Sequence, residues 1–406
     1  MAEPSARGGP RLGQRLRNNT GMPILTIVIS TRNRASTAME SIATALAVEG
    51  DGLEVVVHDC GDGEELQSQL SSRPADPRLV YRRVAPVSMV ENWRMALECA
   101  TREYVCVIGD DDGIANNVVP AMRWARVLGF EAVVDSRASY YWPDYPLHRA
   151  AGRLGIPDVR GGFEVLDAER EMDRCIGRPF IDIVRLPRLY HGFIRRDLLL
   201  RLREKTGCLL PSTAPDYYSA VALASLQPRY CLLDFLILVS GAPGLPNTGR
   251  DARSPKTLVA HMIEYGGAAW PEILPRCTSS SMIVGEAMVT AAEATNRPDL
   301  LRRLNWPAIL GIALRENPSQ VREFIRCVSK LADRSGLSLA PLASGMLAHM
   351  VRYSYRRLRL KAGNRPPLRS LPGPRAEGLM EAVALVQQHL RDKGTSPPWP
   401  TESHSP

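Results

Sequence analysis

Residues 104–113 read YVCVIGDDDG: five apolar residues, a glycine, three consecutive aspartates and a second glycine. A short apolar run is typical of a strand that is buried on both faces of a parallel sheet. Three adjacent carboxylates repel one another unless a cation or hydrogen-bond donors compensate them. Mg²⁺ and Mn²⁺ are hard cations that take one or two carboxylates together with substrate phosphates. The stretch therefore predicts a divalent-cation site at the end of a buried strand, and a solvated acidic turn is the alternative.

Apolar runs of the same kind lie upstream, at residues 24–30, 53–58 and 79–84, with helical patterns around 36–46 and 90–100 between them. Strands that alternate with helices predict a doubly wound α/β sheet. In such sheets ligands bind beyond the carboxyl ends of the strands. Polar clusters follow three of the predicted strands, and we expect them to meet at one edge: residues 31–32, 59–62 and 110–112.

The bulk composition describes an ordinary globular protein of 406 residues, with 45% apolar residues and a formal charge of +8. This charge favours anionic partners such as nucleotides or anionic lipid. The eight cysteines are scattered and form no CxxC pair, so a zinc ribbon is not expected and a reducing cytoplasm is the simplest compartment. Residues 1–22 have no apolar core and are expected to be a flexible leader and not a signal peptide.

Four segments carry a resemblance to a known family. They read LTIVISTRNR at 25–34, VVVHD at 55–59, NWRMALECA at 92–100 and EYVCVIGDDD at 103–112. Over about residues 24–125 the chain resembles the family 2 glycosyltransferases, which are inverting enzymes with the GT-A fold. The resemblance implies a GT-A-like doubly wound mixed sheet flanked by helices, with a nucleotide half at about 23–128 and an acceptor half at about 129–250.

The resemblance also implies a donor site at the strand ends. Thr31 and Arg32 would contact the nucleotide, and Asp59 would bind the base, usually uracil. Asp110 and Asp112 match the DxD motif, whose carboxylates hold the donor diphosphate through Mg²⁺ or Mn²⁺. The donor-binding residues are therefore expected to be Thr31, Arg32, Asp59, Asp110 and Asp111, with Asp110 and Asp112 on the metal.

An inverting transfer needs a base that takes the proton of the acceptor hydroxyl. The family supplies an acid at the start of a helix about a hundred residues beyond DxD, and Asp216 stands at that place here. Pro215 departs from the Glu-Asp pair that relatives commonly have, and Glu91 stands before Asn92 where many relatives have an arginine. A helix cap is the alternative role for Asp216.

Two further features of the acceptor half each have two interpretations. His191 is a late metal ligand or acceptor contact, or else a hydrogen-bonded structural histidine. The aromatic residues Tyr140, Tyr141, Trp142 and Tyr145 form a sugar-stacking platform or pack locally. The run Tyr230–Val239 is predicted to be one apolar strand, too short to span a bilayer.

Residues 255–392 are mainly helical in pattern and are predicted to form a C-terminal domain, followed by a disordered tail at 393–406. Within 352–375 eight basic residues and no acid occur, with tyrosines and leucines between them. This segment either lies on an anionic membrane surface or is a solvated linker. No nucleic-acid recognition module is found, so a nucleic-acid partner is not expected.

The sequence thus predicts a metal-dependent glycosyltransferase that moves a sugar from a nucleotide-sugar, by expectation a UDP-sugar, to a saccharide or lipid-linked acceptor. Bacterial surface polysaccharide or glycoconjugate synthesis is expected from the resemblance, in the cytoplasm and with peripheral contact at the inner membrane face. Two alternatives stay open: a nucleotidyltransferase that forms sugar nucleotides, and an inactive protein that binds nucleotides or glycans. The first usually has a glycine-rich loop after the first strand, where this chain reads TRNR at 31–34.

Overall fold

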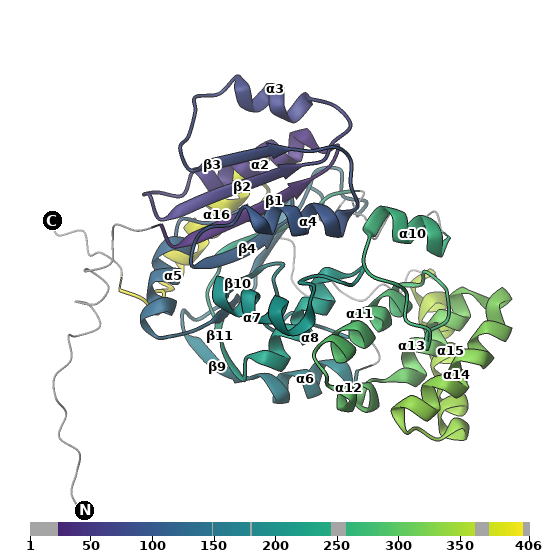
Figure 1. Ribbon diagram of the computed structural model, residues 1–406. Coiled ribbons are helices and arrows are strands. Elements are labelled where there is room, and N and C mark those ends of the chain that lie inside the picture. The colour runs from purple at the N-terminus through teal and green to yellow at the C-terminus, as the bar shows by residue number, and fades with distance from the viewer. Residues whose placement is uncertain (1–22, 148, 179–180, 245–256, 362–372, 401–406) are drawn as a thin grey trace, which may run out of the picture.

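The computed structural model describes residues 23–147, 149–178, 181–244, 257–361 and 373–400 (Figure 1). The predicted leader at 1–22 lies outside the described residues. The strands of the larger sheet are, in spatial order, β3 (Leu79–Arg83), β2 (Leu53–Asp59), β1 (Leu25–Thr31), β4 (Tyr104–Ile108), β10 (Gly192–Arg195), β6 (Ala132–Asp135), β11 (Arg229–Leu233) and β9 (Phe163–Asp167). The first four are parallel, whereas β10 runs antiparallel between β4 and β6. The predicted mixed α/β sheet of GT-A type is confirmed.

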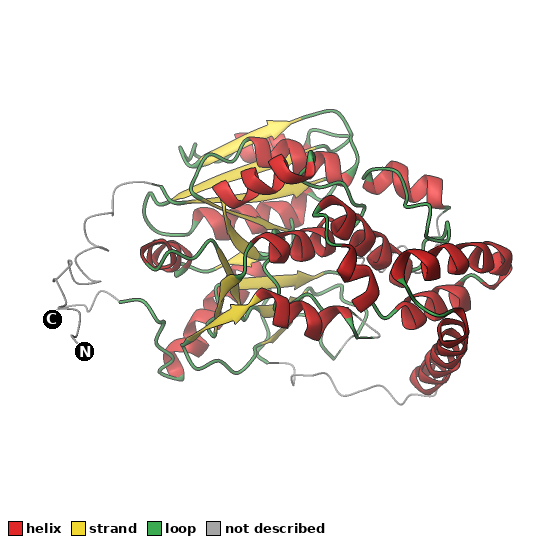
Figure 2. Ribbon diagram, turned by 60° about the horizontal axis from the view of Figure 1, so that its bottom comes forward, coloured by secondary structure: helices red, strands yellow, loops and turns green. Residues whose placement is uncertain are grey.

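Both faces of this sheet are covered by helices, which explains why its central strands β1, β2 and β4 are buried and largely apolar (Figure 2). Val28 of β1 points into one core with Val90 of α4 (Met89–Glu98). Its neighbours Ile27 and Ile29 point into the opposite core with Ile42 of α2 (Ala35–Leu46). The remaining helices of this part are α3 (Glu65–Ser71), α5 (Val118–Val127), α6 (Ala168–Ile176), α7 (Arg196–Thr206) and α8 (Pro215–Leu226).

A second, four-stranded sheet corrects one prediction. Its strands are, in spatial order, β5 (Gly113–Ile114), β12 (Leu238–Ala242), β7 (Ala138–Tyr141) and β8 (Arg153–Gly155). The run Tyr230–Val239 is therefore not one strand, because it ends β11 in the larger sheet and begins β12 in the smaller one. The buried Asp135 carboxylate redirects the chain by accepting the backbone N–H groups of Ile237 and Leu238, at 3.2 and 2.8 Å.

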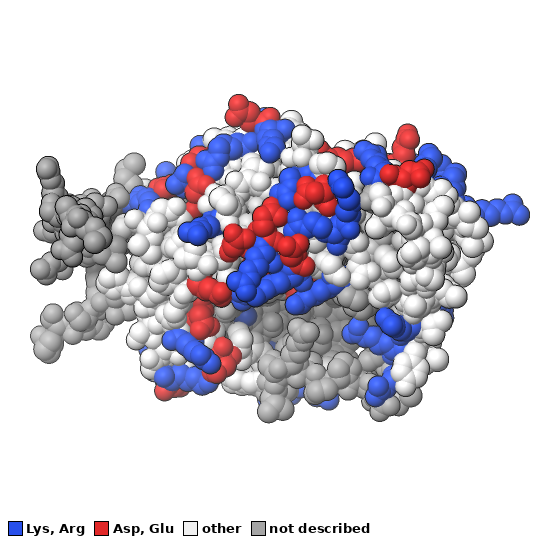
Figure 3. Space-filling view, turned by 90° about the horizontal axis from the view of Figure 1, so that it is seen from below, with Lys and Arg blue, Asp and Glu red and all other residues white. Residues whose placement is uncertain are grey.

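The C-terminal helices pack against the second half of the sheet region, chiefly against α8. They are α10 (Leu258–Tyr265), α11 (Ser280–Ala294), α12 (Pro298–Arg303), α13 (Trp306–Glu316), the 3₁₀ turn η1 (Pro318–Gln320), α14 (Val321–Ser335) and α15 (Leu339–Lys361). Helix α11 lies against α8, and one hydrophobic core continues from the sheet through both. On the surface, Glu169 of α6 pairs with Arg297 and Arg303 at 2.6 and 3.0 Å. The face of the molecule in Figure 3 carries basic and acidic side chains next to one another.

The last described segment returns to the first half of the chain. Helix α16 (Leu379–Asp392) packs on α2, β5, β7 and β12, and in Figure 1 it lies apart from α13, α14 and α15. Residues 393–400 were predicted to be disordered, yet the Trp399 ring is buried against Trp124 and Phe235. Burial of this large ring explains the difference, and the predicted domain boundaries themselves stay predictions. No described helix has both the length and the apolar character that crossing a membrane requires.

Candidate active site

The polar clusters at the strand ends do converge. In the parallel register Thr31 lies opposite Asp59, and β4 runs beside β1 up to Ile108. The chain beyond β4 therefore emerges next to Thr31, whose hydroxyl donates to Asp110 Oδ2 at 2.7 Å. This bond joins the ends of two strands that are far apart in the sequence.

Arg34, just before α2, pairs with two of the three aspartates. Its guanidinium lies 2.6 Å from Asp110 Oδ1 and 2.8 Å from Asp111 Oδ2. Burial raises the pKa of Asp110, although Arg34 and the Thr31 hydroxyl oppose this. Burial and the neighbouring carboxylates raise the pKa of Asp111 to about 7, against the opposing effect of Arg34. The two carboxylates thus converge on one positive group, and Mg²⁺ or Mn²⁺ could be held by the same oxygens.

Asp112 is surrounded differently, because its side chain is fully buried and accepts four hydrogen bonds. Oδ1 accepts the N–H of Gly241 at 2.7 Å, and Oδ2 accepts that of Gly109 at 2.6 Å. Oδ2 also lies 3.0 Å from the Tyr190 hydroxyl and 2.6 Å from His191 Nε2. These donors hold the aspartate in place, so coordination of a metal by Asp112 stays a prediction.

The protonation of the Asp112–His191 pair follows from its surroundings. Burial alone would raise the pKa of Asp112, but His191 and the N–H donors bring it below the ordinary value. Burial lowers the pKa of His191 against the opposing effect of Asp112, so the imidazole is neutral at pH 7. A neutral ring next to an ionised carboxylate must carry its proton on Nε2. His191, in the left-handed region with φ of 60°, is therefore a structural donor, stacked on Tyr190 at 3.8 Å.

Two glycines make room for this arrangement. A Cβ at Gly241 would lie 1.9 Å from the Asp111 carbonyl oxygen, and a Cβ at Gly109 would lie 2.5 Å from Asp111 Oδ1. The indole N–H of Trp142 donates to the same Asp111 carbonyl at 3.2 Å. Because Trp142 and Tyr140 are buried, these two rings pack in the core and do not form an open sugar platform.

The other predicted donor contacts surround the cluster. Asp59 is buried and accepts the N–H of Gly61 at 2.8 Å and the hydroxyl of Tyr81 at 2.9 Å. Arg32 is exposed and lies 3.7 Å from Asp62 in the adjacent turn, so the structure does not bring it into the acidic cluster. Binding of a base by Asp59 and of a nucleotide by Arg32 stays a prediction.

Asn92 and Glu91 have local roles in the structure. The amide oxygen of Asn92 lies 2.6 Å from His58 Nδ1. Its amide nitrogen donates to the carbonyls of Thr31 and His58, both at 3.4 Å. It thereby fastens α4 to the ends of β1 and β2. Glu91 pairs with Arg94 at 2.5 Å on the same helix.

Asp216 lies in the first turn of α8, with Pro215 at the helix start. The Ser219 hydroxyl, one turn later, accepts the N–H of Leu189 at 3.3 Å. Leu189 directly precedes the Tyr190–His191 pair that binds Asp112, so residues 189–191 connect the first part of α8 to the acidic cluster. Burial raises the pKa of Asp216, and its N–H contacts and the buried Arg188 oppose this.

Sequence reasoning found the aspartates and missed some of the groups that hold them. Tyr190 and Gly241 lie about 80 and 130 residues beyond the aspartates that they contact. The only sequence signal for Gly241 is a glycine that interrupts an apolar strand, a common mark of close backbone approach. Among the described residues, no group of three or more His, Cys, Asp or Glu side chains is arranged to hold a metal ion.

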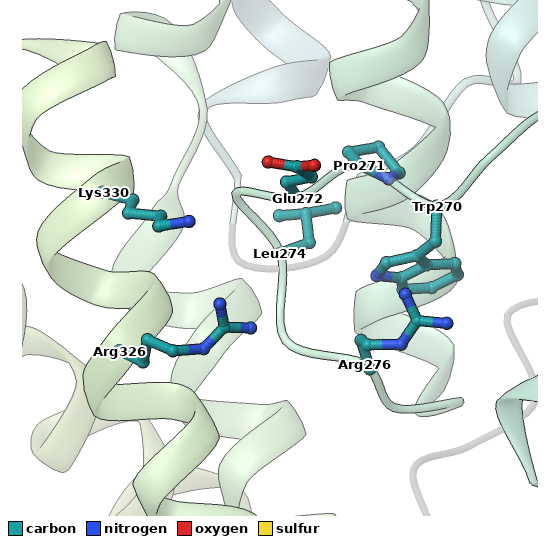
Figure 4. Close-up of a pocket in the computed structure, with 7 residues that line it drawn as sticks. All are labelled: Trp270, Pro271, Glu272, Leu274, Arg276, Arg326 and Lys330. Carbon is teal, nitrogen blue, oxygen red and sulfur yellow. The ribbon is translucent and has the colours of Figure 1, made fainter.

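A separate hollow of about 250 Å³ lies between α14 and the loop before α11 (Figure 4). Arg326 and Lys330 of α14 face the loop residues Glu272 and Trp270. None of the residues that line this hollow belongs to the strand ends, so the acidic cluster is the candidate active site.

Comparisons with known proteins agree with this location. Residues 26–181 match the family model described as Glycosyl transferase family 2. The structure of S. aureus TarS 1–349 in complex with UDP-GlcNAc has a TM-score of 0.48 and 16% identity, over 82% of this chain and 92% of that one. The mannosyltransferase PcManGT from Pyrobaculum calidifontis, in complex with GDP-Man and Mn²⁺, has a TM-score of 0.41 and 18% identity, over 92% and 89%.

These two likenesses are too low to bear on donor, acceptor or mechanism. No curated protein matches the sequence. The family match includes the strand ends and all three aspartates, and thus the centre of the site. The resemblance seen in the sequence is therefore confirmed over residues 26–181, which match the model of the family 2 glycosyltransferases.

Proposed function

We propose that the protein is an inverting, metal-dependent glycosyltransferase that uses a nucleotide-sugar, by expectation a UDP-sugar. The acceptor is a hydroxyl group of a saccharide or a lipid-linked glycan, in bacterial surface polysaccharide or glycoconjugate synthesis. One observation carries the proposal: the family 2 region places Asp110 and Asp111 together at the carboxyl ends of β1 and β4. All eight cysteines are free, which agrees with action in the cytoplasm.

The donor diphosphate is assigned to the open side of the acidic cluster. Asp110 and Asp111 would hold a Mg²⁺ or Mn²⁺ ion, because their carboxylates already converge on the Arg34 guanidinium. The bound ion would supply positive charge that neutralises the leaving nucleoside diphosphate. Arg34 is then free to turn toward a phosphate oxygen, and Asp112 keeps the loop in place through its four hydrogen bonds.

Asp216 is proposed as the base. The acceptor oxygen attacks the anomeric carbon from the face opposite the nucleotide, and its proton passes to the Asp216 carboxylate. The bond between the anomeric carbon and the phosphate oxygen breaks, and its electron pair leaves with the nucleoside diphosphate. Burial of Asp216 supports this role, because a raised pKa makes the carboxylate a stronger base.

The test is nucleotide release from a panel of UDP-, GDP- and dTDP-sugars, with Mn²⁺, with Mg²⁺ and with EDTA. We expect release from one donor, lost with EDTA and in Asp111→Asn. Asp333→Asn, which changes an exposed aspartate on α14, is the matched control and should behave as wild type.

The outcomes separate the alternatives. Metal-dependent donor binding with no release, in the presence of a broad panel of glycan acceptors, would contradict transfer and favour an inactive binding protein. Formation of a sugar nucleotide from a nucleoside triphosphate and a sugar phosphate would favour the nucleotidyltransferase. Release that is unaffected by EDTA would overturn the metal assignment alone.

A further inference from the structure

Helix α15 exposes a continuous apolar stripe. Its four large side chains are Leu347 (59% exposed), Val351 (59%), Tyr355 (63%) and Leu358 (65%). Their spacing of four, four and three residues places them on one side of the helix. Exposed apolar side chains are ordinary one by one, whereas a contiguous apolar stripe marks a surface that contacts something else.

A basic stripe runs beside the apolar one. Arg352, Arg356 and Arg359 are exposed and follow the same helical spacing, one residue after Val351, Tyr355 and Leu358. From residue 339 to residue 361 the sequence holds no acid. The outward side of α15 therefore combines apolar and positively charged side chains over the same length of helix.

The inward side of α15 is fixed to the body of the protein. Leu342 and Met346 are buried in the main core, and α15 packs along α13. The Tyr353 hydroxyl donates to the Glu316 carboxylate at 2.6 Å. The acid of α13 is thus paired with the inward side of α15. Arg357 is exposed and lies over the Tyr353 ring at 5.7 Å, so Tyr353 holds it next to the inward side.

The stripe lies at the periphery of the molecule. In Figure 1 α13, α14 and α15 form the end of the molecule that is farthest from α3. A shallow hollow of about 320 Å³ runs along the stripe and is lined by Val351, Tyr355 and Leu358 together with Arg315 of α13. None of the side chains that line this hollow is acidic.

Two occupants could cover an apolar stripe of this kind, and charge decides between them. A second copy of the chain would bring two rows of arginines together around the apolar contact, which costs free energy by like-charge repulsion. A surface of anionic lipid offers negative headgroups for the arginines and a hydrocarbon boundary for the apolar side chains. The observed pattern fits the lipid surface.

We propose that α15 is an interfacial membrane-docking helix that lies flat on an anionic bilayer. Leu347, Val351, Tyr355 and Leu358 enter the boundary between headgroups and acyl chains, and Arg352, Arg356 and Arg359 contact the phosphates. This proposal does not depend on the reaction that the acidic cluster carries out. The proposed docking surface begins at Leu347, nearer the middle of α15 than the predicted segment 352–375. Residues 362–372 of that segment lie outside the described residues.

The test is sedimentation of the full-length protein with vesicles of phosphatidylcholine alone and of phosphatidylcholine with 30% phosphatidylglycerol. We expect binding to the anionic vesicles only. Because each arginine near such a surface contributes roughly fivefold in affinity, Arg352→Gln with Arg359→Gln should weaken binding roughly 30-fold. Val351→Ser with Leu358→Ser should also weaken it, since two apolar side chains leave the boundary.

Matched controls use exposed residues elsewhere. Arg170→Gln on α6 and Leu200→Ser on α7 change the same residue types and should bind as wild type. Equal binding to neutral and anionic vesicles, or no loss in either double variant, would overturn the proposal. A wild-type dimer in light scattering that Val351→Ser with Leu358→Ser turns into a monomer would show that a second copy covers the stripe instead. Thermal unfolding of each variant separates loss of binding from loss of fold.

Discussion

At the scale of single residues, the partners of the three aspartates divide them into two kinds. Asp110 and Asp111 share the Arg34 guanidinium and are the less buried ones, whereas Asp112 is enclosed by donors from three parts of the chain. A carboxylate whose oxygens already accept hydrogen bonds is a poor candidate for binding a ligand and a good one for fixing a loop. We therefore propose Asp111, in place of the predicted Asp112, beside Asp110 on the metal.

The base assignment predicts a separation of binding from turnover. Asp216→Asn should lower kcat by roughly 10²- to 10⁴-fold, the usual contribution of a general base. Donor affinity should be nearly unchanged, because the acidic cluster stays intact. Steady-state kinetics together with calorimetric titration of the donor check this, and normal turnover in the variant would refute the assignment.

The surroundings of Asp216 also predict a pH dependence. A base works only when ionised, and burial raises the pKa of Asp216 in the folded protein. Activity should therefore be present above this raised pKa and fall as the pH drops through it. The fall should occur at a higher pH than the ordinary aspartate pKa of roughly 3.9 would give. The measurement is kcat against pH at saturating donor and metal, so that Asp111 is already liganded. If the residual kcat of Asp216→Asn still falls at the same acidic pH, the fall belongs to the titration of another group.

Gly241 is predicted to accept no other residue. The Cβ of Gly241→Ala would meet backbone atoms of Asp111, which cannot move aside as a flexible side chain can. We expect a loss of about 1–3 kcal/mol in the free energy of unfolding, as for other overpacked sites, and weaker metal-dependent donor release. Gly63→Ala, in open space, is the control. Equal stability of the two variants in urea unfolding would contradict the close approach.

At the scale of elements, the start of α8 is held by a residue of α11. Buried Glu286 accepts the hydroxyls of Ser212 and Thr213 at 2.7 and 3.0 Å, and the N–H of Thr213 at 3.3 Å. These residues form the turn that leads directly into Asp216. The C-terminal helices therefore contribute to the position of the candidate base, although they lie outside the family match.

This contact predicts an effect across the two parts of the chain. Glu286→Ala leaves several buried donors without a partner and should cost about 1–3 kcal/mol of unfolding free energy. It should also lower kcat more than it changes donor affinity, because the loop before Asp216 loosens. Glu293→Ala on the same helix removes only a surface pair with Arg334 and serves as control. Equal effects of the two variants on kcat would speak against a positioning role.

The elements also show how far the sequence could predict the fold. The limits of β4 agree with the predicted apolar run, and those of β1, β2 and β3 lie within one residue of the predicted runs, because each has an apolar pattern with a clear end. The sequence marks the break between β11 and β12 only by Asp234, a single acid in an apolar run, and the turn itself depends on Asp135 of another strand. In the same way the three aspartates are visible in the sequence. Their separation into an Arg34-paired pair and an Asp112 enclosed by Tyr190 and Gly241 arises only from tertiary contacts.

At the scale of the whole molecule, α16 and the segment after it join the last described part of the chain to the first half. The N–H of Leu379 donates to Glu40 of α2, and Val383 lies over Gly113 directly after the aspartates. Trp399 closes the far end of this contact against Trp124. The acidic loop is thus supported from behind by residues that lie more than 250 positions away.

The packing of Trp399 predicts a large effect of one residue near the end of the described chain. Trp399→Ala should lower the free energy of unfolding by about 3 kcal/mol, the lower end for a buried tryptophan. Trp399→Phe should recover most of this loss, because an aromatic ring again fills the site. Denaturant unfolding measures both, and an unchanged midpoint in Trp399→Ala would restore the prediction of a disordered tail.

The return of α16 has a consequence for the order of events during synthesis. Domains generally fold from the amino terminus as the chain leaves the ribosome. Here α2 and the smaller sheet lack one of their covering helices until residue 392 has emerged, so Gly113 and the core around it stay exposed while the helical part is made. A nascent chain would therefore keep this face uncovered through much of translation, and α16 would cover strands that were made long before it.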